Sequence, residues 1–224
     1  MMHRPARKLL APIVAGALYS VARWWFIRWG AAVSEVAAAL PGDELITNPS
    51  TVTTRAITIN APPDDIWPWL VQMGQDRGGL YSYDWLESLC GLHFHNADRI
   101  VPEWQRLEVG DQIRAAPASA GPEAGFTVVA IDPPRSIVTA IGDPGRVVAD
   151  AKAGALPDGG TWVFVLRPLD SHRTRLIVRL RARFGLPKMA EWFATRLLEP
   201  IHFVMERKQL LGIERRVMSS TLTR

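Results

Sequence analysis

The chain has 224 residues, 48% hydrophobic and 21% charged, which is an ordinary mixture for a globular domain with a sizeable core. Its single cysteine, Cys90, excludes an internal disulfide framework and a cysteine-rich zinc site, and we interpret it as a small buried apolar residue. The net charge is +4, and residues 1–30 carry five basic side chains and no acidic one. No basic run interleaved with aromatic residues follows, so nucleic acid is not an expected partner.

The N-terminal segment, residues 1–30, contains a stretch of the length that crosses a bilayer. Over 9–27 only Arg23 is charged, and a membrane span needs ~20 residues. Tryptophan, tyrosine and arginine gather at its end, where such side chains favour lipid headgroups. We predict association with a membrane through residues 9–29, as a span or an interfacial helix, at the cell membrane and on an undetermined side. A cleaved secretory signal, or a helix lying on the domain itself, are the alternatives.

Residues 31–50 are predicted to be a connector that holds a short alanine-rich helix over 34–40. The β-branched run 51–60 indicates a strand, and it begins a domain that we expect to extend over 51–218.

Two helices follow the first strand. The first opens with prolines and acidic residues at 61–65 and ends at Gly74, and the second is expected over 82–90. From Gly110 onward, short β-rich runs alternate with proline and glycine turns, which predicts a series of strands. These strands cover 111–116, 126–132, 137–142, 161–169 and 174–184.

The last of these runs alternates strictly between apolar and basic residues. Such alternation predicts an antiparallel sheet with one covered face and one solvent face. The arginines Arg175, Arg179, Arg181 and Arg183 are therefore expected on the solvent face.

A terminal helix is predicted from residue 187 or 188 to about 217, with a broad apolar stripe. Pro200 requires a kink or a break within this helix. Because a sheet with one apolar face needs a cover, the helix is expected to lie across that face, which gives an α+β fold class.

This order of elements, together with four phrases, resembles the START-like SRPBCC superfamily, which includes pollen-allergen-like and polyketide-cyclase-like proteins. The phrases are WGAAVSEVAAALPGDEL (29–45), TRAITINAPPDDIWPWLVQMGQDRGGLYSYDWLE (54–87), HNADRIVPEWQRLEVGD (95–111) and TRLIVRLRAR (174–183). The resemblance implies a helix-grip fold, in which a curved antiparallel sheet wraps around the long helix and encloses an elongated apolar cavity.

The resemblance also implies which side chains line that cavity. The sheet would contribute Trp162, Phe164, Leu166, Leu176, Val178 and Leu180, the terminal helix Trp192, Phe193, Leu197 and Ile201, and the mouth Trp67, Trp69 and Tyr81. Large side chains of this kind either line a space or fill it, and the sequence leaves both open.

The polar stretch from residue 81 to 111 is where acid–base chemistry is expected, with Tyr81, Asp84, His95 and Glu103 as candidate catalytic residues. The alternative is that these polar residues cap helices and pair with one another to brace a long loop. His93 and His95 have no third ligand at a recognisable spacing, so no metal is expected. Neither a phosphate-binding loop nor a nucleophile elbow is present, and no cofactor is expected.

We therefore predict a protein that binds or transports an apolar small molecule, such as a lipid, a sterol or a polyketide-like compound, at a membrane. A cyclase-like or aromatase-like enzyme is the alternative, although the sequence favours a binding role over catalysis. An interaction module with a filled core is the third hypothesis.

Overall fold

The computed structural model describes residues 5–75, 77–82, 96–115, 121 and 125–221, with the backbone alone for residues 5–13 and 221. The helix predicted over 82–90 and the residues Cys90 and His93 lie outside these ranges, apart from Ser82.

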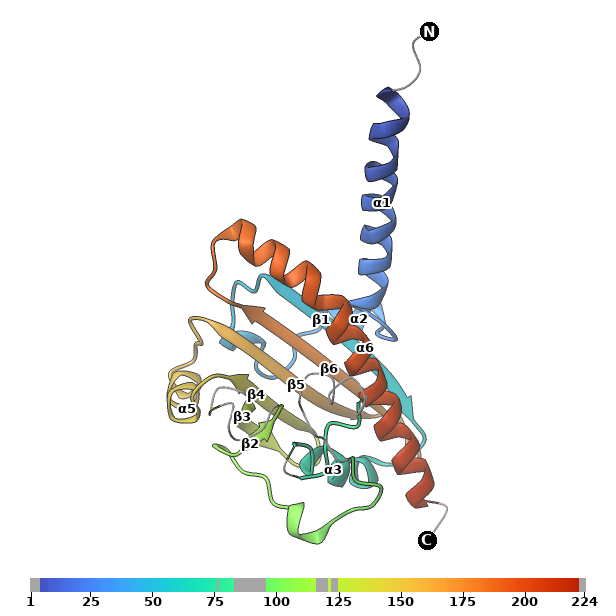
Figure 1. The fold of residues 1–224 in the computed structure, drawn as a ribbon. Helices are drawn as coiled ribbons and strands as arrows, with labels where there is room; N and C mark the ends of the chain where they lie inside the picture. The colour runs from blue at the N-terminus through green and yellow to red at the C-terminus, as the bar shows by residue number, and fades with distance from the viewer. Residues whose placement is uncertain (1–4, 76, 83–95, 116–120, 122–124, 222–224) are drawn as a thin grey trace.

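A six-stranded antiparallel sheet forms the centre of the molecule, in the order β1-β6-β5-β4-β3-β2 (Figure 1). Every predicted strand is present within a few residues of its expected bounds. The strands are β1 (Thr51–Ile59), β2 (Gln112–Arg114), β3 (Gly125–Asp132), β4 (Ser136–Ile141), β5 (Gly159–Pro168) and β6 (Thr174–Arg183).

The long helix α6 (Lys188–Thr221) runs across the concave face of the curved sheet, and the shorter helix α3 (Pro63–Val71) covers the same face near the end of α6 (Figure 1). Apolar side chains of both helices and of the sheet form one buried cluster there. The expected fold is confirmed, because a curved antiparallel sheet that grips one long terminal helix is the helix-grip arrangement.

The opposite face of the sheet is covered as well, which corrects the prediction of a solvent face. The connector forms α2 (Val33–Ala37) and the short 3-10 helix η1 (Asp43–Leu45). Helix η1 packs on this face through Leu45, and arginines of β6 bind α2 there by hydrogen bonds. Helix α5 (Pro144–Lys152), which we did not predict, also covers it, and a further 3-10 helix, η2 (Pro102–Trp104), lies in the loop before β2. A second apolar cluster lies between these elements and the sheet.

The burial of arginines on β6 is the clearest consequence of this covering. Arg179 is only 2% exposed and donates hydrogen bonds to the carbonyl oxygens of Glu35, Val36 and Ala38, and it forms an ion pair with Asp43 at 2.5 Å. Carbonyl groups at the end of a helix lack helical partners, so the guanidinium supplies the donors that α2 needs. Of the four arginines, only Arg183 is exposed as predicted.

Helix α1 (Pro5–Phe26) projects away from the domain, and its last turns contact α6 (Figure 1). Directly after it, the backbone oxygens of Ile27 and Trp29 accept hydrogen bonds from Thr54 and Ala56 on the free edge of β1. Within the described part of the chain, no helix combines the length and the apolar character that crossing a bilayer requires.

Candidate ligand site

Helix α6 consists of two halves that differ in burial. From Glu206 to Val217 its inward side chains are buried against the sheet and α3, whereas from Met189 to Ile201 its large apolar side chains are exposed. Pro200 stands near the boundary between the halves, and Figure 1 shows that α6 is bent along its length. A proline removes one helical hydrogen bond and disturbs the preceding turn, so the predicted kink is present.

The side chains predicted to line the sheet wall of a cavity fill the space beneath the second half of α6. Trp162 lies between Phe126 and Phe164, with ring centroids 4.7 and 4.6 Å away, in a tilted and an edge-to-face arrangement. The other members of the predicted wall are close-packed in the same apolar cluster, namely Leu166, Leu176 and Val178, together with Trp69 and Tyr81, while Trp67 and Leu180 are partly buried against it. The alternative that these side chains form a core therefore describes most of them.

The predicted contribution of α6 to an enclosed cavity is wrong for four residues. Trp192, Phe193, Leu197 and Ile201 are 50–71% exposed and lie on the outer surface of the helix. The first half of α6 diverges from the direction of the second half (Figure 1), and among the described residues its apolar stripe has no partner surface.

The candidate catalytic residues are not brought together by the structure. Tyr81 is buried and donates from its hydroxyl to the carbonyl oxygen of Trp69 at 3.0 Å, and burial raises its pKa above the usual value. Its backbone adopts a positive φ of 59°, and Arg216 lies 4.7 Å above its ring. Tyr81 therefore holds the core together, and Glu103 is exposed on η2. Asp84 and His95 lie outside the described residues, and their role stays a prediction.

A pocket of about 150 Å³ lies under the first half of α6, against β1 and β6. Its apolar wall comes from Leu180, Phe184 and Leu198, and only Leu180 belongs to the predicted set. The polar side of the pocket is formed by Thr51, Thr53, Thr195, Glu199 and His202.

One of these polar groups, the carboxylate of Glu199, is hydrogen-bonded by other residues of the protein. Arg23 of α1 donates two hydrogen bonds to its carboxylate, both 2.7 Å long, and Thr51 donates a third at 2.6 Å. Burial alone would raise the pKa of Glu199, but the bonds from Arg23 and Thr51 outweigh it and the pKa lies below its usual value. This carboxylate is a structural anchor for α1.

Thr53 differs from Thr51, although both point from β1 towards α6. Its side chain is 1% exposed, it lines the pocket, and its hydroxyl has no hydrogen-bond partner among the described residues. A buried polar group is normally paired, so Thr53 leaves one unsatisfied hydroxyl in the wall of the pocket, buried from water.

Next to the pocket, a buried ionic network joins the sheet to α6. Arg55 is fully buried and donates from Nη1 to Glu206 Oε2 at 2.5 Å and to His202 Nδ1 at 3.0 Å. Trp162 Nε1 donates to the other oxygen of Glu206 at 2.8 Å. Burial raises the pKa of Glu206, but the positive charge of Arg55 and the hydrogen bonds from Arg55 and Trp162 outweigh it, and the pKa is lowered.

The same network fixes the state of His202. Because a guanidinium can only donate hydrogen bonds, Nδ1 of His202 accepts from Arg55, and the ring is neutral with its proton on Nε2. Burial lowers the pKa of His202, and the positive charge of Arg55 lowers it further against the opposing effect of Glu206. His202 therefore presents a neutral imidazole to the pocket.

Sequence reasoning missed this network, although two signals were present. Arg55 occupies an inward position of β1, in register with Thr53 and Ile57, where a charge needs a buried partner. His202 and Glu206 are four residues apart and therefore share one face of a helix. The combination indicates a buried arginine that binds α6.

Comparison with known proteins finds solved structures that align with most of this chain at low sequence identity. No protein-family model and no curated protein matches the sequence. Among solved structures, a conserved protein of Geobacillus kaustophilus is 14% identical, with a TM-score of 0.41 over 76% of this chain and 97% of that chain. The polyketide-cyclase-like protein Cgl2372 of Corynebacterium glutamicum is 16% identical, with a TM-score of 0.39 over 76% and 93%.

A third solved structure is the two-domain aromatase/cyclase BexL of the BE-7585A biosynthetic pathway, which is 11% identical. Its TM-score is 0.39, over 75% of this chain and 46% of that chain. At these identities and TM-scores, the solved structures indicate no function for this chain.

Proposed function

We propose that this protein binds an apolar small molecule in the pocket between β1, β6 and the first half of α6, and that α1 places this site at a membrane. The observation that carries the proposal is the pocket, whose wall holds the buried hydroxyl of Thr53, a group with no hydrogen-bond partner in the described part of the chain. Apolar walls with a few convergent polar groups are typical of small-molecule sites. The ligand would therefore carry a hydroxyl or carbonyl oxygen that bonds to Thr53.

The size of the pocket narrows the ligand class. Its volume of about 150 Å³ equals that of a cavity that holds a benzene molecule and is well below the 300–1,000 Å³ of drug-sized sites. A whole sterol or phospholipid does not fit. A single ring, or the end of an acyl chain that continues past the half-exposed Phe184, does fit.

The proposal is tested by ligand capture and by a cavity-filling variant. Native mass spectrometry of gently purified full-length protein is expected to find a co-purifying small molecule, and a fluorescent fatty acid is expected to bind and displace it. Leu180→Trp fills the pocket and should abolish probe binding. Leu169→Trp places the same side chain on an exposed turn and should not change it.

Two results would contradict the proposal. The first is a protein that carries no small molecule and does not bind the probe. The second is a Leu180→Trp variant that binds the probe as tightly as the unmodified protein, because the bound probe would then lie elsewhere.

A further inference from the structure

Large apolar side chains stand exposed on two neighbouring helices, the first half of α6 and the last turns of α1. Exposed apolar patches larger than isolated residues mark interaction sites. The exposed fractions are 50–71% on α6 and 60–66% on α1. We call the following residues the aromatic surface: Met189, Trp192, Phe193 and Leu197 of α6, with Leu18 and Trp24 of α1.

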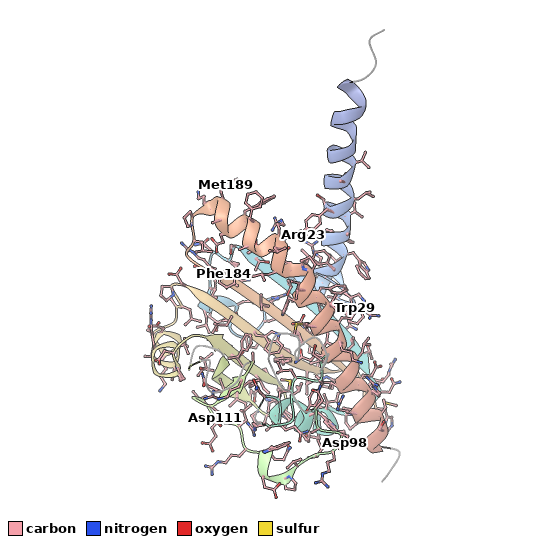
Figure 2. The ribbon with its side chains drawn as sticks, viewed as in Figure 1. Arg23, Trp29, Asp98, Asp111, Phe184 and Met189 are labelled. Atoms are coloured by element: carbon pink, nitrogen blue, oxygen red, sulfur yellow. The ribbon has the colours of Figure 1, made fainter. Side chains whose placement is uncertain are left out.

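The two helices meet at a fixed junction. Tyr19 donates to the carbonyl oxygen of Arg196 at 2.8 Å, and Arg23 pairs with Glu199. Figure 2 shows Arg23 at this junction and Met189 at the far end of α6, on the side of the molecule from which α1 projects. The same turns of α6 that expose this surface carry the pocket wall on their opposite side.

The charges beside the aromatic surface are positive. Its two neighbouring carboxylates are committed internally, since Glu191 accepts from the backbone of Phe184 and from Ser50, and Glu199 accepts from Arg23. The basic residues of the N-terminal segment have no acidic counterpart within that segment. An anionic partner surface is therefore favoured over a neutral or basic one.

Each helix also carries an exposed indole paired with a guanidinium. Arg196 lies 5.4 Å above the ring of Trp192, and Arg28 lies 5.4 Å above the ring of Trp24. Indole rings favour the headgroup depth of a bilayer, and arginine binds phosphate oxygens there. An open groove of about 440 Å³ extends from Trp24 and Arg28 to α2. Tryptophan and arginine side chains therefore also line the surface at the base of α1.

From these observations we infer that the first half of α6 is a membrane-docking element, which lies in the headgroup region of an anionic bilayer beside α1. Helices with an apolar face rich in tryptophan, phenylalanine and leucine, and with basic flanks, bind bilayers in this way. The inference rests on the proposed membrane placement by α1 and adds a second contact. The pocket then lies directly against the lipid, where an apolar ligand can enter without crossing water.

The test is flotation of the full-length protein with vesicles of phosphatidylcholine alone or mixed with phosphatidylglycerol. The protein is expected to float with the anionic vesicles and to be partly released by salt, which screens the arginines. Trp192→Ala combined with Phe193→Ala should lower vesicle affinity at least tenfold. The control, Val109→Ala with Leu169→Ala, removes side chains of similar exposure elsewhere and should leave the affinity unchanged.

Three outcomes would overturn the inference, and they are distinguishable. If the unmodified protein binds no vesicle, the membrane part of the proposed function fails together with the inference. If Trp24→Ala weakens binding but the Trp192/Phe193 variant does not, only the inference fails. If the protein is instead a dimer that the Trp192/Phe193 variant dissociates, and neither form floats, the surface is an interface between copies. Binding of the fluorescent fatty acid by the Trp192/Phe193 variant in solution tests the pocket independently.

Discussion

Two threonines on the inward face of β1 allow the buried hydroxyl of Thr53 to be tested by measurements of folding stability alone. Thr51 and Thr53 are both buried, but Thr51 donates to Glu199 at 2.6 Å whereas Thr53 has no partner among the described residues. Valine has nearly the same shape as threonine, so each substitution replaces a hydroxyl by a methyl group and changes little else. The two variants are therefore expected to change the free energy of unfolding in opposite directions.

The magnitudes follow from the contacts. Thr51→Val removes a hydrogen bond to a charged group, which is worth about 1.5–3 kcal/mol, and it destabilises the protein. Thr53→Val removes an unpaired buried hydroxyl, and we expect it to stabilise the ligand-free protein by about 1 kcal/mol. For a chain of this size, 1 kcal/mol corresponds to a shift in Tm of about 2–4 °C.

Urea unfolding followed by tryptophan fluorescence measures both variants, with calorimetry for the Tm. In the same samples, Thr53→Val should weaken the binding of an oxygen-containing ligand about two- to tenfold, the worth of one hydrogen bond. A destabilised Thr53→Val variant would refute the reasoning, because the hydroxyl would then be paired in the folded protein.

Five further substitutions test the contacts that hold α6, the connector and α1. Arg55→Met leaves the carboxylate of Glu206 buried without its cation and should cost about 3–5 kcal/mol in urea unfolding, while a second change, Glu206→Leu, should recover most of the loss. His202 has a lowered pKa in the folded protein, so as the pH falls below about 6.5 the unfolded chain binds a proton before the folded protein does. The free energy of unfolding should therefore fall from pH 7 to pH 5, and His202→Leu should make it less dependent on pH in this range. Arg179→Met should speed amide hydrogen exchange over the connector at 33–45, because α2 loses the donors that bind its carbonyl groups. Tyr19→Phe should cost only about 0.5–1.5 kcal/mol and should raise amide exchange at the end of α1, whereas unchanged exchange would show that its hydrogen bond does not hold the helix.

The sequence was sufficient for the order of elements, because each strand and helix has its own local pattern. The alternation in 174–184 predicted β6 to within one residue of its observed end, Arg183. Helix α5 was missed because it buries only Val147, which leaves almost no apolar period, although Asp143 and Pro144 are ordinary signals of a helix start.

The sequence was not sufficient for the environment of charged side chains, because their partners lie far away along the chain. Arg179 and its acceptors in α2 are separated by more than 140 residues, and an arginine on a solvent face would give the same alternation. Likewise, large apolar residues at inward positions are compatible with a filled core or with a lined cavity. Phe164 and Leu180 follow the same pattern, yet only Leu180 reaches the pocket.

Pro200 connects three features of the site that the sequence presents separately. Because proline has no backbone N–H, the carbonyl oxygen of Arg196 lacks its usual partner four residues later, and the hydroxyl of Tyr19 takes that place at 2.8 Å. The bend of α6 also separates its first half from the deep core, which leaves room for the pocket beneath it and leaves Trp192 exposed above it. The junction with α1, the pocket and the exposed surface therefore all lie within two or three turns of this one residue, because the helix cannot continue regularly through it.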